Sequence, residues 1–164
     1  MPSAIQLEVA RLVKSQRWAA IATNSDGAPL ASMVAYAPEP GLAGLLLFLS
    51  QLSAHTRALL ESNATSIAIT APDTGEGDPQ LLPRVSLQGT ITPIPRNSAE
   101  FAPAAARYVE RFPDSEIRFQ LGDFVMFRFA PEDVRYVGGF ARATTYTGAQ
   151  LREAGQALDA GSGG

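Results

Sequence analysis

The stretch Leu45–Leu60, LLLFLSQLSAHTRALL, changes from an apolar run to a polar turn and then to a helix. Its first residues, LLLFL, are continuously apolar, which is typical of a strand buried on both faces. Ser53 then stands at a helix N-cap position, and the helical pattern continues to about Glu61. A strand that leads into a helix presents free N–H groups and the positive end of the helix dipole. The sequence therefore predicts a phosphate seat at the polar turn that contains the single histidine.

Composition limits the class of protein. A chain of 164 residues with 46% hydrophobic content predicts one domain with its own core. A formal charge of −3 argues against nucleic-acid binding, and the absence of cysteine excludes disulfides and thiolate metal sites. One histidine gives no His-rich metal site, so we expect no metal. No apolar run reaches about 18 residues, so we expect no membrane span and a cytoplasmic protein.

Short elements with hairpin connections make up most of the chain. Asp26-Gly27 is a hairpin signal between two strands, and Ser3 with Gln6 forms a capping-box pattern before an amphipathic helix. Few parallel crossovers are expected, so the pattern predicts an α+β, mainly antiparallel β barrel with peripheral helices. The predicted helices are 4–15, 53–61 and 100–111, and the predicted strands are 18–23, 30–37, 45–49, 66–70, 84–94 and 124–130.

The last third of the chain is less regular. Pro131-Glu132-Asp133 is interpreted as a turn, after which Val134–Val137 pairs back on the strand before it. Trp18 is expected to pack in the core under the first hairpin. We expect residues 4–147 to form the domain and residues 148–164 to form a flexible C-terminal tail, weakly helical from Ala149, that ends in Gly-Ser-Gly-Gly.

Six segments of the chain carry a resemblance to a known family. They are Trp18–Thr23, Pro29–Val34, Leu49–Leu59, Pro83–Gly89, Gly122–Phe124 and the closing run Val137-Gly138-Gly139-Phe140-Ala141-Arg142-Ala143. By their order and spacing, rather than by one diagnostic motif, these segments resemble the pyridoxamine 5′-phosphate oxidase-like, FMN-binding split barrels. The likeness is closest to the haem-utilisation (HugZ-type) branch of that family.

The resemblance implies a six-stranded split β-barrel that forms a homodimer with FMN in a groove between the subunits. The function it implies is that of a flavoprotein, a flavin-dependent oxidoreductase whose small-molecule substrate and catalytic residues the sequence does not specify. The cofactor-binding residues that it suggests are Ser32, Met33, Val34, Ser50, Ser53, His55, Thr56, Arg57 and Arg84.

Two alternative functions, and two alternative roles for Arg84, stay open from the sequence. The oxidases carry arginine at the position of Ser32 and an Arg-Lys pair at His55-Thr56, so a dimer that has lost its cofactor is one alternative. A haem-binding or haem-degrading protein of the HugZ type, with haem as the cofactor, is another. Arg84 is expected either to contact the flavin or to pair with Asp78 or Glu76 on the surface.

Overall fold

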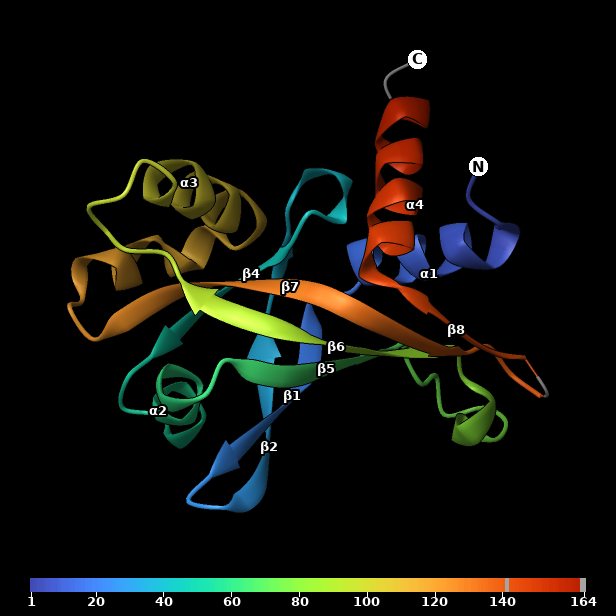
Figure 1. The fold of residues 1–164 in the computed structure, drawn as a ribbon, viewed down its shortest axis with the longest axis horizontal. Coiled ribbons are helices and arrows are strands. Elements are labelled where there is room, and N and C mark those ends of the chain that lie inside the picture. The colour runs from blue at the N-terminus through green and yellow to red at the C-terminus, as the bar shows by residue number, and fades with distance from the viewer. Residues whose placement is uncertain (141, 163–164) are drawn as a thin grey trace.

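In the part of the chain that the structure describes, one curled antiparallel sheet of eight strands is surrounded by four α-helices (Figure 1). The structure is a computed structural model and describes residues 1–140 and 142–162. The predicted α+β, mainly antiparallel fold class is confirmed. The elements are α1 (Ala4–Ser15), β1 (Trp18–Ser25), β2 (Ala28–Ala35), β3 (Ala37–Pro38), η1 (Pro40–Leu42), β4 (Leu45–Ser50), α2 (Ala54–Glu61), β5 (Ala64–Thr70), η2 (Pro79–Leu81), β6 (Arg84–Pro93), α3 (Phe101–Arg111), η3 (Pro113–Gln120), β7 (Phe124–Val137), β8 (Ala143–Thr147) and α4 (Gly148–Gly161).

The strand order explains why the sheet curls into a split barrel. The order is β2-β1-β5-β6-β7-β4-β3, and β8 pairs with β7 beside this path. The strands at the two ends of the order, β2 and β3, are joined in sequence through Tyr36, so the two edges are drawn toward each other. Six of the strands are long and match the predicted ones; β3, with two residues, and β8 add to them.

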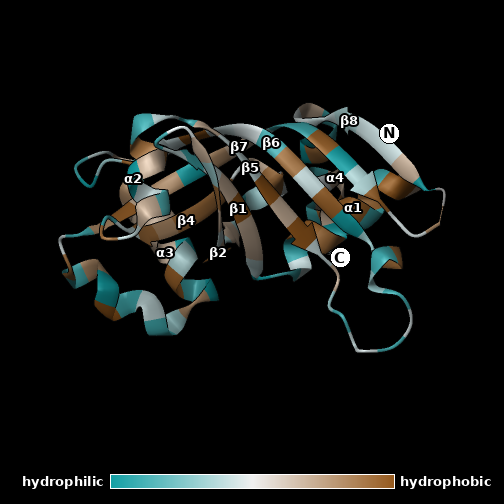
Figure 2. Cartoon of the chain, turned by 90° about the horizontal axis from the view of Figure 1, so that it is seen from below, coloured by the Kyte–Doolittle hydropathy of each residue, from teal (hydrophilic) through white to brown (hydrophobic). Residues whose placement is uncertain are grey.

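The core lies on both sides of β4, as the uninterrupted apolar run predicts. Leu45, Leu47 and Leu49 point into the main core, between the curled sheet and α1. Leu46 and Phe48 point into a second cluster, under α3. Figure 2 shows this strand in the hydrophobic colour. Burial on both faces fixes the strand that leads into the α2 turn.

The prediction of a turn at Pro131-Glu132-Asp133 is wrong, because β7 continues to Val137 as one strand. Gly89 lies opposite Pro131 and Gln88 opposite Asp133, so Glu132 is the extra residue of a β-bulge. Proline has no N–H to donate to the neighbouring strand, and a bulge is one of the few places in a sheet that tolerate this loss. A Cβ on Gly89 would collide with the carbonyl oxygen of Ala130, so glycine permits the close approach of the two strands.

The bulge also reverses which residues of β7 face the core. Phe127 and Phe129 are fully buried before it, whereas Val134 and Tyr136 are buried after it. An unbroken alternation from Phe129 would turn Arg135 inward. With the extra residue, Arg135 lies on the outer face of the sheet and is exposed.

The expectation of a flexible tail from residue 148 is corrected for Gly148–Gly161, which form α4. Thr147 and Gln150 make a capping box at its start, and Leu151 and Ala154 are fully buried. Asp159 accepts a hydrogen bond from the backbone N–H of Gly41 at 2.6 Å, which ties the helix to η1. Ala141, Gly163 and Gly164, which belong to the predicted closing segment and tail, lie outside the described residues.

Two local predictions near the N-terminus are confirmed. Ser3 and Gln6 form the expected capping box of α1. Asp26 and Gly27 have φ values of 52° and 79°, the positive pair that a type I′ hairpin turn requires. Of the helices in the described part of the chain, none has the length and apolar character needed to cross a membrane.

Candidate functional site

The turn between β4 and α2 satisfies much of its polar chemistry internally. The Ser50 hydroxyl donates to the Asp123 carboxylate at 2.7 Å and accepts from the N–H of Leu52 at 3.2 Å. The N–H of Gln51 donates to the Asp123 carbonyl oxygen at 2.7 Å. The turn is therefore attached to the segment before β7, and a carboxylate that was not among the predicted cofactor residues stands beside it.

The first turn of α2 keeps some features of an anion site and lacks others. Ser53 is the N-cap residue, but its side chain makes no capping bond to the helix within the described structure. Burial lowers the pKa of His55 below its ordinary value of 6.5, which favours the neutral ring. Arg57 donates to the carbonyl oxygens of Leu52 at 2.8 Å and Gln51 at 3.3 Å. The guanidinium thus stabilises the turn through its backbone carbonyl oxygens.

Thr56 faces the interior of the protein. Its side chain is fully buried, and its hydroxyl has no hydrogen-bond partner among the described residues. A hydroxyl closed off in this way is not accessible to a ligand at the helix start without rearrangement.

Three of the predicted residues lie on β2 and divide between the two faces of the sheet. Ser32 lies opposite Ile21 and Val34 opposite Ala19, so both point to the inner face. Met33 lies opposite Ala20 and points outward, with 48% of its surface exposed. The structure therefore separates Met33 from its neighbours in sequence.

A groove of about 530 Å³ crosses the outer face of the sheet, over β1, β5, β6 and the end of β7. We call it the outer-face groove. Trp18 and Met33 form its apolar side, and Trp18 is 58% exposed. The prediction that Trp18 packs in the core is wrong, because Ala19 and Ile21 take the inward positions of β1 and leave Trp18 outward.

Two arginines lie at the other side of the outer-face groove. Arg84 donates to the carbonyl oxygens of Gln80 at 2.6 Å and Leu82 at 3.3 Å. Its expected surface partner Asp78 instead accepts from the N–H of Gln80 at 2.9 Å. Arg135 also lines the groove and was not among the predicted residues. The signal that could have found it is the reversal of alternation between Phe129 and Val134.

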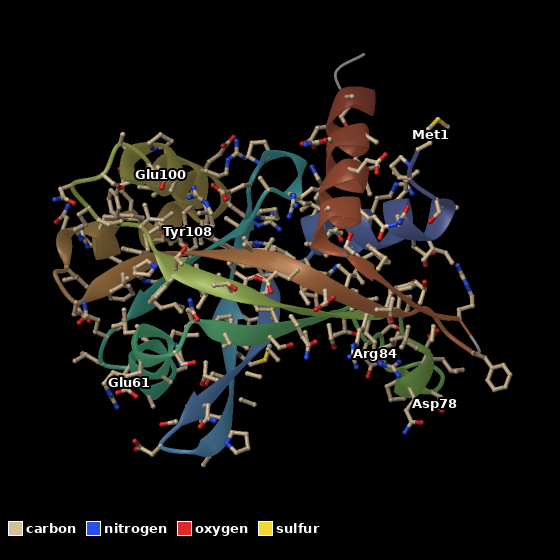
Figure 3. All side chains as sticks on the ribbon, in the orientation of Figure 1. Met1, Glu61, Asp78, Arg84, Glu100 and Tyr108 are labelled. Carbon is tan, nitrogen blue, oxygen red and sulfur yellow. The ribbon has the colours of Figure 1, made fainter. Side chains whose placement is uncertain are left out.

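The predicted cofactor residues do not form one cluster in a single chain. Arg84 and Met33 line the outer-face groove, whereas α2 lies at the opposite end of the sheet in the views of Figure 1 and Figure 2. Figure 3 labels Arg84 beside η2 and Glu61 at the far end of α2. The turn offers N–H groups and the Ser53 hydroxyl for a phosphate. The groove offers an apolar wall and two cations.

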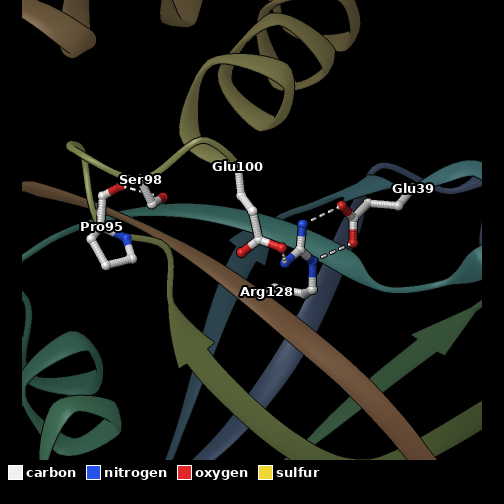
Figure 4. A network of polar contacts seen from close by, with 5 residues as sticks. All are labelled: Glu39, Pro95, Ser98, Glu100 and Arg128. Carbon is white, nitrogen blue, oxygen red and sulfur yellow. Dashed lines mark hydrogen bonds and ion pairs between the residues drawn. The ribbon is translucent and has the colours of Figure 1, made fainter.

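A separate polar groove of about 560 Å³ lies between α3 and the sheet, and three of its charged residues pair with one another. Arg128 donates to both oxygens of the Glu39 carboxylate, at 2.7 and 2.8 Å, and lies 3.3 Å from Glu100 (Figure 4). Hydrogen bonding to Glu39 raises the pKa of Arg128. This network attaches the start of α3 to β7. Within the described residues, no group of three or more His, Cys, Asp or Glu side chains is placed to hold a metal.

The sequence matches the CREG β-barrel family over residues 6–149, most of the chain. The chain belongs to this family. The predicted resemblance to the split barrels is thereby confirmed. No curated protein matches the sequence.

Solved structures with a similar fold include proteins that bind different ligands. A haem-binding protein from Mycobacterium smegmatis is 28% identical with a TM-score of 0.83; the match covers 93% of this chain and 62% of that one. HutZ, a haem storage protein from Vibrio cholerae, is 23% identical with a TM-score of 0.67, covering 80% of this chain and 92% of that one. An FAD-binding protein from Mesorhizobium loti is 18% identical with a TM-score of 0.63, covering 80% and 91%. The last two show likeness of fold alone.

Proposed function

We propose that the chain is one subunit of a homodimeric, FMN-binding flavoprotein related to the pyridoxamine 5′-phosphate oxidases. Its activity would be that of a flavin-dependent oxidoreductase on a small molecule. The observation that carries the proposal is the outer-face groove, where Trp18 and Met33 stand exposed beside Arg84.

The shape and chemistry of the groove suit an isoalloxazine ring. Its volume of about 530 Å³ lies in the ordinary range of small-molecule sites. A flat aromatic ring gains most from an apolar wall that contains another aromatic side chain, which Trp18 provides. A fixed positive charge near the pyrimidine edge stabilises reduced flavin, and Arg84 supplies one. The residues of the groove therefore fit the ring of the cofactor, which would supply the redox chemistry when bound.

The same surface supports the proposed homodimer. Trp18 and Met33 are large apolar side chains on an open sheet face, and exposed apolar surface of this kind marks interaction sites. A second copy over this face would cover the groove and exclude water from the ring. A sedimentation measurement that gives a dimer mass supports the assignment, and a monomer mass at micromolar concentration contradicts it.

Titration with FMN tests the proposal. Trp18 is the single tryptophan of the sequence, so its fluorescence reports binding without a background from other tryptophans. We expect saturable quenching and a perturbed flavin spectrum. The variant Ala20→Phe places a bulky side chain in the groove, which Ala20 lines. It should abolish both the quenching and the spectral change by filling the groove. Parent protein that leaves the flavin spectrum unchanged at high FMN concentration would overturn the proposal.

Haem is the second candidate. The groove contains the exposed thioether of Met33 and two arginines, and a thioether is a known axial ligand of haem iron. The Mycobacterium smegmatis neighbour, 28% identical, is a haem-binding protein. A Soret shift on haem titration that is lost in Met33→Leu would favour haem over FMN. If the parent binds neither cofactor but is a dimer, the third reading, a barrel that has lost its cofactor, is favoured.

A further inference from the structure

We infer that Arg84 and Arg135 together bind the anionic group of the ligand in the outer-face groove. The inference rests on the proposed function, because it concerns the same groove and names the part of the ligand that the arginines recognise. The ligand class that follows is a flat aromatic molecule that carries a phosphate or carboxylate group at one end.

The sheet register places the two arginines as diagonal neighbours on one face. Arg84 of β6 lies opposite Val137 of β7, and Arg135 lies opposite Ser86. Diagonal positions across an antiparallel pair are roughly 7–8 Å apart, within the reach of long side chains. Two guanidinium forks at this separation are able to meet on one phosphate or carboxylate.

The β-bulge is what brings Arg135 to this face. β7 would present Arg135 to the core if the alternation of Phe127 and Phe129 continued without an extra residue. The register shift at Gln88 and Gly89 reverses the alternation and turns Arg135 outward beside Arg84. Bulges commonly re-aim side chains next to functional sites.

The arginine side of the groove has an excess of positive charge. Carbonyl oxygens hold Arg84 in place but do not neutralise it. The guanidinium of Arg135 makes no hydrogen bond or ion pair with any residue that the structure describes. Asp73 is the acidic residue of the groove lining, and one of its oxygens accepts from the N–H of Gly75 at 2.9 Å. Two cations against one carboxylate favour an anionic ligand group.

The α2 turn is less suited to the same group. Its Ser50 hydroxyl is bonded to the Asp123 carboxylate, whose charge repels another anion. Burial of His55 lowers its pKa and favours the neutral ring, so the turn sets one arginine, Arg57, against one carboxylate, whereas the groove sets two arginines against one. The groove therefore offers the stronger electrostatic attraction of the two places.

Pairs of ligands that differ in the anionic group test the inference. FMN is compared with riboflavin, which lacks the phosphate, and haem is compared with its dimethyl ester, which lacks free carboxylates. Binding to the parent, Arg135→Gln and Arg84→Gln is followed by Trp18 fluorescence. Arg118→Gln, at an exposed position on η3, serves as the matched control. Thermal unfolding of each variant checks that the fold is retained, and Arg135→Lys keeps the charge without the fork.

We expect Arg135→Gln to weaken the binding of FMN or haem by about tenfold or more, the typical effect of a lost charge-assisted hydrogen bond. Riboflavin and the haem ester should bind the variant within about threefold of the parent, because they lack the charged group. An equal loss for both members of a pair, or no loss for either, overturns the inference and leaves the proposed function standing. The same holds if Arg57→Gln, rather than Arg135→Gln, abolishes the preference for the charged ligand. A parent protein that binds none of the four ligands overturns both.

Discussion

The α2 turn and the outer-face groove differ in where their polar groups find partners. In the turn, Ser50 is bonded to Asp123 and Arg57 to the carbonyl oxygen of Leu52. In the groove, Arg135 and the apolar Trp18 and Met33 face outward without such closure in the described structure. The turn looks like a binding site in the sequence because its polar residues are adjacent. The groove is assembled from residues far apart in the chain.

This difference teaches that adjacency of polar residues does not distinguish a ligand site from a well-braced connection. A polar group with a local partner gains little from a ligand, because binding must first break the existing bond. Exposed apolar side chains on a sheet face gain from any partner that removes them from water. The comparison therefore supports the proposal that the turn stabilises the fold and that the groove binds the ligand.

The largest expected effect separates the two regions by placing a charge in each. Met33→Glu puts a carboxylate on the apolar side of the groove and should weaken dimerisation at least about 100-fold, because an unpaired charge is costly to bury. Leu52→Glu, at a leucine of the turn that is 79% exposed, is the matched control and should leave the proposed dimer intact. Sedimentation over a concentration series measures both. Dissociation by Leu52→Glu alone would reverse the assignment.

The next effect concerns the β-bulge that turns Arg135 toward the groove. Gly89→Ala should lower the free energy of unfolding by at least about 2 kcal/mol, because the new Cβ collides with the Ala130 carbonyl oxygen. Gly122→Ala has open space around the added methyl group and should change stability by less than about 0.5 kcal/mol. Denaturant unfolding measures the two values. Equal stabilities would mean that the bulge does not depend on glycine.

A smaller effect tests whether the turn is structural. Ser50→Ala removes the hydrogen bond to the Asp123 carboxylate and should cost about 1–2 kcal/mol of stability while leaving FMN affinity unchanged. Ser53→Ala removes a hydroxyl that makes no capping bond within the described chain, and it should cost less than about 0.5 kcal/mol. Loss of FMN affinity in either variant, with stability preserved, would show that the FMN phosphate binds at the turn.

The smallest effect is the pH dependence that His55 contributes. Burial lowers the pKa of folded His55 below 6.5, so the unfolded chain binds this proton first as the pH falls. The free energy of unfolding should therefore decrease as the pH is lowered through 6.5 toward the folded pKa, and His55→Gln should remove this contribution. NMR of the single histidine gives the folded pKa. An upward shift of that pKa on FMN binding would show that the phosphate lies at the turn.

Local signals in the sequence were sufficient for much of the fold. The apolar run of β4 and the Asp26-Gly27 turn depend on neighbouring residues, so both were predictable. The continuation of β7 through Pro131 was not, because it depends on Gly89 of another strand. By its propensity, proline is expected to end a strand. The bulge that tolerates Pro131 forms only when β6 and β7 pair.

The site was less predictable for the same reason. Met33 and Arg84, which line the outer-face groove, were among the predicted residues, but the exposure of Trp18 and the outward direction of Arg135 depend on strand register. The packing of α4 against α1 and η1 is likewise tertiary, although its capping residues Thr147 and Gln150 are visible in the sequence. The residues of a groove on a sheet face come from several strands, and the sequence of one strand does not show which residues of the others lie beside it.

The most direct test of the central claim, that the outer-face groove is the ligand site, is the electron density of crystals grown with FMN. We expect density for the ring over Trp18 and Met33, with the phosphate between Arg84 and Arg135. Density for the phosphate at Ser53 and Arg57, with the groove filled by side chains of a second copy, would contradict it.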